Sequence, residues 1–541
     1  MNNNIWLEIK SPKNIIAAIQ NAIFPEIGLP HKIEQSNEDF ILIGYFTSFE
    51  DRFSHINLLN EVKKWGFKRI TNSNSLFLLF FFDKRKQKLQ VSVDQFPSFS
   101  CYFSIFDNKV VFSSAFGPIK NELRKAQALR IDADFLLSHL LWEWSNTDHT
   151  LIERIKMVPG GCQATFDLKD LRFENVQTLM DINAFYDSIR PGTYTSLEQF
   201  STDLLGLLTE VVERRVSQIP KNFKIGCDIS SGFDCTLVSY CLSRILPHGG
   251  FSGFSDHSKI MGDENSPEVV KRFSLKHNIP LKQFDYTEHT LHLNDLDQNW
   301  LVDQAVNPFV YVHHQPYINF LNENGIRILF TGEYGDEAYD MKNMELFSRF
   351  PVQRGYFDSF VTLKRRKKED FFPKSSQTLF SDQQRFKERG YYPLIVPSAS
   401  ASCYLPLIEA YGDRGINQIN PFSDTRILAL SHQAPLPIGV EPDRTKELIM
   451  PYFKSIMPEN YISISNAGEP FLQLFINQKL FVKEVLSKSV LGSMGIIDPG
   501  LITRYINDPK SDLYNDKTYQ RAMQLYPIIY LDWYLQKNNI G

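Results

Sequence analysis

The chain has 541 residues, of which 43% are hydrophobic and 22% are charged. This composition supplies enough apolar side chains for more than one folded domain and excludes a disordered chain. The formal net charge is -4 at pH 7, so the sequence lacks the basic surplus that a general nucleic-acid binder needs.

The N-terminal stretch and the cysteines indicate a reduced, cytoplasmic protein. The opening residues contain no apolar signal core, and the apolar run Leu76–Phe82 is too short to cross a bilayer. The six cysteines form no CxxC pair and no disulfide framework, so we expect reduced and mostly buried thiols. We therefore expect a cytoplasmic protein that has no membrane partner.

The first third of the chain is predicted to be rich in β-strands. The continuous apolar run Leu76–Phe82, the charged segment 83–88 and the alternating segment Leu89–Val93 are typical of a buried strand, a hairpin turn and a partner strand. The other elements predicted in this region are two strands and one helix, at Lys109–Ser114, Cys162–Leu168 and Ala133–Trp144.

A lapse of the pattern around Tyr186–Ser196 marks the predicted domain boundary, which divides the chain into residues 1–190 and 191–541. A helix follows and reaches about Val216, and the last hundred or so residues look mainly helical. Between them, strands alternate with helices, which predicts a parallel sheet with its ligands at the carboxyl ends of the strands. The alternating segments are Phe223–Ile229, Cys235–Ile245, Phe251–Ser255, Pro267–His277 and Ile326–Phe330.

The segment after the first of these strands has the features of a phosphate-binding loop. Three small residues, Ser230-Ser231-Gly232, follow the strand, and a helix opens near Asp234. Small side chains let backbone N–H groups approach an oxyanion, and the helix N-terminus favours negative charge. Ser230 and Thr236 can donate hydroxyl hydrogen bonds to phosphate, while Asp234 suits a Mg²⁺ ligand. Taken alone, the segment would more often be an ordinary turn in which Asp234 caps the helix.

A second loop has a related composition. The strand Ile328–Phe330 ends in a glycine-containing turn that carries Glu333, Asp336 and Glu337. In isolation, this turn would be interpreted as a solvated acidic turn. Together, the two strand ends supply a phosphate cradle and acidic groups, and they predict a site for Mg²⁺ and a polyphosphate with Asp234 and Asp336 as the metal ligands.

The two loops resemble motifs of one enzyme family. Ser230–Cys235 resembles the SGGxDS pyrophosphate loop of the N-type ATP pyrophosphatases, and the TGEYGDE segment 331–337 is similar to the SGEGxDE element of asparagine synthetases. Three further segments resemble the family's late glutaminase-domain segment, its stretch ending in lPPG and its PFLD, at Asp94–Leu123, Arg130–Phe166 and Asn420–Asp424. The resemblance covers most of the chain, and the ordered series is more specific than any single motif.

This resemblance implies a fold and a ligand set. The fold is an α+β N-terminal domain, an Ntn-hydrolase-like β-sandwich, followed by an α/β ATP-pyrophosphatase domain of the adenine nucleotide α-hydrolase-like type with a helical C-terminal part. The implied ligands are ATP and Mg²⁺. The residues implied to bind the nucleotide are Ser230, Ser231, Gly232, Asp234, Cys235, Thr236, Ser255 and Gly332.

One family feature is missing from the N-terminal domain. Glutamine hydrolysis in this family relies on a cysteine at position two, whereas this chain has Asn2 there and no cysteine before Cys101. An Asn side chain cannot replace a thiolate nucleophile, so we expect no glutamine hydrolysis. The amine would come from free ammonia, from the substrate itself, or from a peptide N-terminus or lysine. β-Lactam synthetases and lasso-peptide macrolactam cyclases also lack the cysteine, and they resemble this chain in layout.

Glu333 is the predicted general base of the reaction. Asparagine synthetases resemble this chain in carrying Glu at that place, whereas β-lactam synthetases carry Tyr. A carboxylate can accept the proton of an attacking amine. The alternative is a structural role, in which Glu333 caps a backbone turn.

Three departures from the family pattern leave a catalytically inactive homologue as an alternative. Ser231 replaces the first Gly of the loop, Cys235 replaces a Ser, and the Lys expected near 466–468 is absent from the segment SISNAGEPF. Lys446 matches a structural Lys of the family and is a candidate to reach the phosphates. Loss of such an electrostatic group typically lowers a rate about 10²–10³-fold.

These features predict an ATP-dependent, AMP- and pyrophosphate-forming amide ligase. It would activate a carboxylate as an acyl-adenylate for attack by an amine, and a precursor peptide is one candidate substrate. The alternatives are asparagine synthesis from free ammonia and an inactive homologue that binds a partner, while a tRNA-modifying or GMP-forming ligase is disfavoured. The pair His313-His314 is interpreted as ordinary site-lining or surface histidines, and the basic run Lys364–Lys368 as a solvated helix face or loop.

Overall fold

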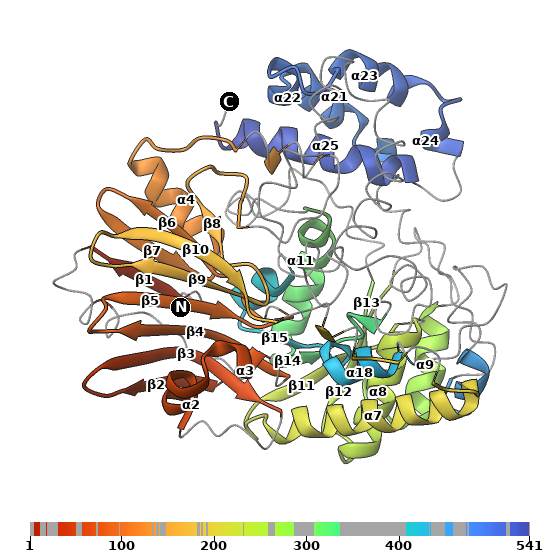
Figure 1. Ribbon diagram of the computed structural model, residues 1–541. Helices are drawn as coiled ribbons and strands as arrows, with labels where there is room; N and C mark the ends of the chain where they lie inside the picture. Colours follow the sequence, from red (N-terminus) through yellow and green to blue (C-terminus); the bar gives the residue numbers. More distant parts are fainter. Residues whose placement is uncertain are drawn as a thin grey trace.

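The protein is described here by a computed structural model with three parts (Figure 1). The first part is a pair of antiparallel sheets, the second is built on one parallel sheet, and the third is a group of C-terminal helices. The structure describes residues 5–10, 31–49, 57–71, 74–96, 98–132, 148–180, 193–230, 232–257, 266–285, 308–335, 407–431, 449–457, 475–515 and 520–539, with a few isolated positions between these ranges.

The two antiparallel sheets stack face to face. One has six strands in the order β10-β9-β5-β4-β3-β2, and the other has four in the order β1-β7-β6-β8. Apolar side chains of both sheets form the core between them. The strands are β1 (Trp6–Ile9), β2 (His31–Ser36), β3 (Phe40–Ser48), β4 (Ser75–Asp83), β5 (Lys88–Val93), β6 (Tyr102–Phe106), β7 (Lys109–Ser113), β8 (Lys156–Met157), β9 (Cys162–Asp167) and β10 (Arg172–Thr178).

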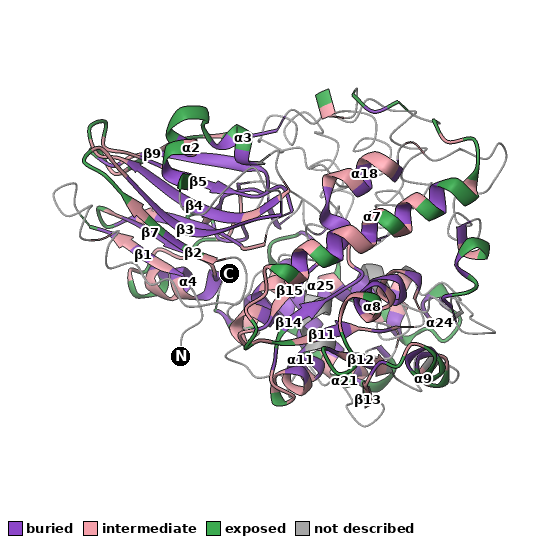
Figure 2. Ribbon diagram, turned by 90° about the horizontal axis from the view of Figure 1, so that it is seen from below, coloured by how far each residue is buried: buried purple, intermediate pink, exposed green. Residues whose placement is uncertain are grey.

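Strand β4 explains why the segment Leu76–Phe82 is apolar at every position. Alternate side chains of a strand point to opposite faces of the sheet. Phe80 and its alternate neighbours face the core between the sheets. Phe81 and its alternate neighbours face a second core under helices α2 (Leu58–Trp65) and α3 (Phe67–Thr71). Both faces of β4 are therefore buried, as Figure 2 shows, and the predicted hairpin with β5 is confirmed.

Helix α4 (Phe116–Lys125) covers the outer face of the four-stranded sheet. Its buried residues Phe116 and Ile119 belong to the same core as Tyr102 and Val111 of that sheet. The N-terminal part is thus a sandwich of two sheets between two helical layers, which we call the sandwich. The predicted strands at 109–114 and 162–168 are confirmed as β7 and β9, whereas the predicted helix Ala133–Trp144 lies mostly outside the described residues.

A five-stranded sheet follows, in the order β13-β12-β11-β14-β15, and every neighbouring pair is parallel. The predicted parallel α/β sheet is therefore confirmed, and all five strands end at one edge. The strands are β11 (Lys224–Asp228), β12 (Ser252–His257), β13 (Leu281–Asp285), β14 (Ile326–Phe330) and β15 (Asn417–Ile419). The helices around them are α7 (Leu197–Ser217), α8 (Phe233–Ile245), α9 (Ser266–Lys276), α11 (Pro308–Glu323) and α18 (Thr425–Ser431), with 3-10 turns η6 (Pro421–Ser423) and η8 (Met450–Phe453).

The C-terminal helices pack on both other parts (Figure 1). Their apolar residues share one core with α4 of the sandwich and with α11 of the parallel-sheet part. Lys120, which is fully buried, donates to Asn538 Oδ1 over 3.0 Å and ties α4 to the C-terminal end. The helices are α21 (Lys479–Ser487), α22 (Val490–Ser493), α23 (Pro499–Asn507), α24 (Asp512–Asn515) and α25 (Gln520–Lys537).

Two general expectations can be compared with this fold. Five cysteines lie in described residues, and all are free; four are buried and Cys235 is partly exposed. No helix in the described ranges is long and apolar enough to cross a membrane.

Candidate functional site

The two predicted loops lie side by side at the carboxyl edge of the parallel sheet. Strands β11 and β14 are direct neighbours, with Cys227 opposite Phe330. Gly332, in the second loop, contacts the start of α8 so closely that a Cβ on it would lie 2.4 Å from the backbone nitrogen of Cys235. The same Cβ would lie 2.7 Å from the Cβ of Asp234. Only glycine permits this approach, so the two loops form one surface.

The first loop is held by its own hydroxyl groups. The backbone N–H of Gly232 donates to Ser230 Oγ over 2.9 Å. The hydroxyl of Thr236 lies 2.6 Å from the carbonyl oxygen of Gly232 and 3.1 Å from that of Ser230, and it donates to them. Gly232 is the N-cap of α8, whose first N–H groups have no acceptor within the helix. These bonds link the described residues of the loop, and the hydroxyl of Thr236, which was predicted to donate to phosphate, donates to carbonyl groups of the loop instead.

The sequence analysis missed two carboxyl groups that lie beside these loops, those of Asp228 and Asp256. Asp228 ends β11, and Tyr317 of α11 donates to its Oδ1 over 2.6 Å. Burial raises the pKa of Asp228 well above its ordinary value, and the nearby carboxylates of Asp256 and Glu333 raise it further, against the hydrogen bond from Tyr317. The signal that could have revealed them is an acidic residue at or near the end of successive parallel strands. Three carboxyl groups, those of Asp228, Asp256 and Glu333, therefore crowd this edge of the sheet, and burial favours the neutral form of Asp228.

Cys235 is not suited to act as a nucleophile. Burial raises the pKa of its thiol well above the ordinary value, and the carboxylates of Asp228, Asp234 and Glu333 raise it further. A thiol reacts as a thiolate, so Cys235 stays protonated at neutral pH. Its place in the first turn of α8 lets it fill space and donate weakly rather than react.

Glu333 is held in a braced turn. Its backbone N–H donates to Thr331 Oγ1 over 3.2 Å, and the hydroxyl of Thr331 donates to Asn420 Oδ1 over 2.6 Å. The next residue, Tyr334, is buried and has φ +68°, a left-handed conformation that bulky residues rarely adopt. Its ring meets Phe96 of the sandwich edge-on, with 5.3 Å between centroids.

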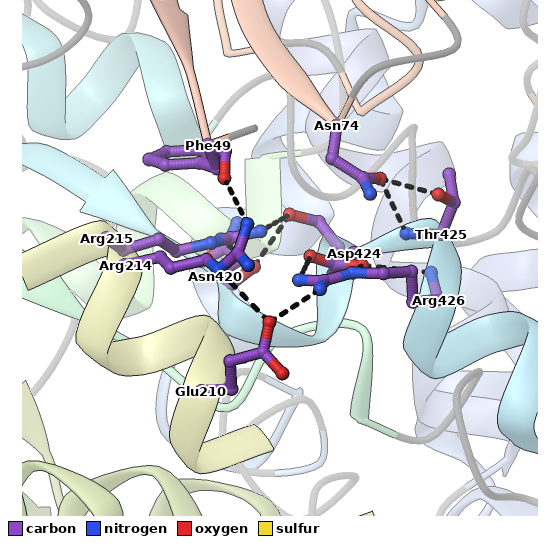
Figure 3. A network of polar contacts seen from close by, with 10 residues as sticks. Phe49, Asn74, Glu210, Arg214, Arg215, Asn420, Asp424, Thr425 and Arg426 are labelled. Atoms are coloured by element: carbon purple, nitrogen blue, oxygen red, sulfur yellow. Dashed lines mark hydrogen bonds and ion pairs between the residues drawn. The ribbon is translucent and has the colours of Figure 1, made fainter. Parts of the chain in front are cut away.

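A polar network connects this turn to the sandwich (Figure 3). The buried guanidinium of Arg215 donates to the carbonyl of Asn420 and, over 3.1 Å, to Ser423 Oγ. It also lies over the ring of Phe49, 4.9 Å from the centroid. Burial lowers the pKa of Arg215 to about 10, opposed by the carboxylate of Asp424, so the group stays charged at neutral pH.

The segment that resembles the family's PFLD lies in the same network. Thr425 donates to Asn74 Oδ1 of the sandwich through its N–H, over 2.9 Å, and through its hydroxyl, over 2.6 Å. Arg426 pairs with Asp424 at 2.9 Å and with Glu210 at 2.8 Å. Residues 420–426 therefore join the parallel sheet to the sandwich rather than forming an isolated turn.

Several predicted site residues lie outside the described residues. Ser255 is described; it is 2% exposed and follows Phe254, the parallel partner of Asp228 at the edge of the sheet. Among the described positions, no group of three or more His, Cys, Asp or Glu is placed to hold a metal ion. The predictions that fall outside the described backbone or side chains are Ser231, Asp336, Lys446, the segment 466–468, His313-His314 and Lys364–Lys368.

Comparisons with known proteins find a similarity in one part of the chain. Residues 54–176 match the glutamine amidotransferase domain model, whereas no curated protein matches the sequence. Among solved structures, the chain overlaps with the allosteric regulatory enzyme of purine biosynthesis at 7% identity and a TM-score of 0.21, over 52% of this chain and 74% of that one. It also overlaps with glutamine phosphoribosylpyrophosphate amidotransferase from B. subtilis, complexed with ADP and GMP, at 8% identity and a TM-score of 0.20, over 61% and 76%.

These overlaps are too weak to carry an argument about the fold. The match to the domain model stands by itself, and it spans α2, α3, α4 and the strands β4 to β9. The sandwich of this chain is therefore similar to a glutamine amidotransferase domain.

Proposed function

We propose that the chain is an ATP-dependent amide ligase that forms AMP and pyrophosphate. The observation that supports this most is the contact between Gly332 and the start of α8 at Asp234 and Cys235. It joins a phosphate-type loop and an acidic loop into one surface at the carboxyl edge of a parallel sheet, where α/β proteins bind ligands. The similarity of residues 54–176 to an amidotransferase domain is compatible with chemistry on amide nitrogen.

The first step would form an acyl-adenylate. The β- and γ-phosphates of ATP would lie on residues 230–236, where the backbone N–H groups at the start of α8 favour negative charge. A carboxylate oxygen of the substrate attacks the α-phosphorus, a new P–O bond forms, and the bond to pyrophosphate breaks. Asp234 and Asp336 are the residues that would hold Mg²⁺, which when bound would supply positive charge for the pyrophosphate group.

The second step would form the amide. The amine nitrogen attacks the acyl carbon, Glu333 accepts its proton, and the C–O bond to AMP breaks. The carboxylates of Asp256 and Glu333 would help to attract a protonated amine to this side of the site, whereas burial favours the neutral form of Asp228. Water must be excluded because it would hydrolyse the adenylate.

The amine would come from solution or from a substrate rather than from glutamine hydrolysis in the sandwich. Burial raises the pKa of Cys101 and of Cys162, so neither thiol is a nucleophile at neutral pH. The similarity to an amidotransferase domain would then be one of fold, with a different role for the sandwich.

Exchange of labelled pyrophosphate into ATP tests this proposal. We expect exchange that depends on Mg²⁺ and on a carboxylate from a panel of amino acids and peptides. Asp234→Ala should lower it at least about 10²-fold, the scale for loss of an electrostatic group at a reaction centre. Gly206→Ala on α7, where an added Cβ meets nothing within 4 Å, is the control. Absence of both exchange and ATP binding in the wild type would favour a binding protein instead.

A further inference from the structure

The turn that carries Glu333 includes a residue in an unfavourable conformation. Tyr334 has φ +68°, where its Cβ and ring are crowded against the backbone and where glycine would be at ease. Such a conformation persists only when the surroundings hold it in place. The contacts of Tyr334 therefore indicate what fixes the direction of its neighbour Glu333.

The sandwich supplies one of these contacts. The rings of Phe96 and Tyr334 meet edge-on at 5.3 Å, and they are 8% and 2% exposed. Edge-to-face contact is a preferred geometry of aromatic pairs. Phe96 lies in the segment after β5, within the region that matches the amidotransferase domain. A residue of that region therefore contacts Tyr334 in the turn of the proposed ligase site.

The segment that presents Phe96 is itself fixed. The carboxylate of Asp94 accepts from the N–H of Ser98 over 2.9 Å, from its hydroxyl over 2.6 Å and from the N–H of Phe77 over 3.3 Å. The N–H of Gly161 donates to the carbonyl of Asp94 over 2.7 Å. Because Asp94 is 1% exposed, these bonds are shielded from water. These hydrogen bonds of Asp94 fix the backbone next to Phe96.

The turn is also held from its other side. Thr331 connects the N–H of Glu333 to Asn420, and the carbonyl of Asn420 accepts from Arg215. Arg215 in turn lies over the ring of Phe49, at the end of β3 in the sandwich. Both sides of the turn therefore lead to the sandwich through buried contacts, one aromatic and one polar.

We propose that Phe96 and Tyr334 are positioning residues through which the sandwich fixes the turn of Glu333. This role rests on the proposed function, because it matters only if Glu333 accepts a proton from the amine. The sandwich would then serve the ligase reaction as a support for the site, without supplying an amine.

Hydrogen exchange of the amides of residues 332–335 in the full-length protein tests this role. Phe96→Leu and Tyr334→Leu should each accelerate exchange there by roughly tenfold, the scale of one buried aromatic pair. The double variant should be no faster than the faster single one, because both remove the same contact. Tyr334→Phe, which keeps the ring and its contact with Phe96, should exchange more slowly than Tyr334→Leu.

Phe40→Leu is the matched control. Phe40 stacks on Phe81 at 5.2 Å and lies at the start of β3, at the opposite end from Phe49. The substitution Phe40→Leu removes an aromatic contact within the sandwich and should leave hydrogen exchange at residues 332–335 unchanged. Equal acceleration by Phe40→Leu, or unchanged exchange in Phe96→Leu, would overturn the role of Phe96.

Calorimetric titration with Mg²⁺ and α,β-methylene-ATP separates this inference from the proposed function. Phe96→Leu should bind the analogue within about twofold of the wild type, since loop 230–236 keeps its own hydrogen bonds. If the wild type binds no analogue, the proposed function fails and the role of Glu333 fails with it. If the analogue binds and exchange in Phe96→Leu does not change, only the role of Phe96 fails.

Discussion

The sandwich and the parallel-sheet part bury different kinds of side chain. Between the two antiparallel sheets, aromatic rings pack edge to face, as Phe112 does with Phe80 and with Phe166. At the edge of the parallel sheet, carboxylates such as Asp228 lie against a tyrosine hydroxyl and other acids. Apolar burial stabilises a fold without directing chemistry, whereas crowded, partly buried acids perturb one another and are typical of functional sites.

The difference suggests a division of labour within the chain. The sandwich supports the parallel-sheet part through specific contacts. Among them are the ring contact of Phe96 with Tyr334 and the hydrogen bonds of Thr425 to Asn74. The parallel sheet supplies the strand ends where charged groups meet. Changes in the first part should therefore alter stability, and changes in the second should alter binding.

Two glycine substitutions sharpen this comparison most strongly. Gly44→Ala in β3 combines φ +146° with a Cβ that would lie 2.1 Å from the carbonyl oxygen of Leu78. We expect a loss of roughly 3 kcal/mol in the free energy of unfolding, at the upper end for one substitution.

Gly332→Ala forces the two loops apart and should weaken ATP binding about 10²-fold with a smaller loss of stability. Chemical denaturation measures the loss of stability, and calorimetry measures ATP binding. A binding loss in Gly44→Ala, or a loss of stability without a binding loss in Gly332→Ala, would contradict the comparison.

A pH series examines the boundary between the two parts. The hydroxyl of Tyr102, in the sandwich, donates to Glu409. Burial raises the pKa of Glu409 from 4.5 to about 8, against the hydrogen bond from Tyr102. The folded protein then binds a proton that the unfolded chain has released, so the free energy of unfolding falls as pH rises from 4.5 to 8.

Glu409→Gln keeps an acceptor for Tyr102 and removes the ionisation. We expect the variant to be more stable than the wild type by about 3–5 kcal/mol at pH 8 and by less than about 1 kcal/mol at pH 5. Denaturant melts at the two pH values measure this. A constant difference between the two proteins across that range would exclude Glu409 as the titrating group.

The smallest effect is expected at the surface of the sandwich. Arg85 pairs with Asp39 at 2.6 Å, but its side chain is 76% exposed. Exposed ion pairs contribute little, so Arg85→Ala should change the free energy of unfolding by less than about 0.5 kcal/mol and leave ATP binding unchanged. A larger loss would mean that polar surface contacts matter to the sandwich as much as its apolar core.

The strongly patterned elements could be predicted from the sequence. The apolar run that became β4 and the alternation that became β11, α8 and β14 identify themselves by period. β15 could not be found this way, because Asn417 and Gln418 are polar and the strand exists only through pairing with β14. The spacing of apolar residues likewise does not predict the order of the strands in the sheet.

The site was only partly predictable for a related reason. Loops 230–236 and 331–335 have recognisable composition, and adjacency of β11 and β14 brings them together. Asp228 was missed because it lies inside the predicted strand Phe223–Ile229, whereas the strand of the structure ends at Asp228 itself. The contact of Phe96 with Tyr334 joins residues far apart in the chain, and no local pattern announces it.

Titration of the full-length protein with ATP and Mg²⁺ tests most directly whether the two strand-end loops form one nucleotide site. The wild type and Gly206→Ala should bind ATP with the same affinity, while Asp234→Ala and Gly332→Ala should each lose most of it. No binding by the wild type, or wild-type affinity in Gly332→Ala, would contradict a shared site built on the contact between Gly332 and Asp234.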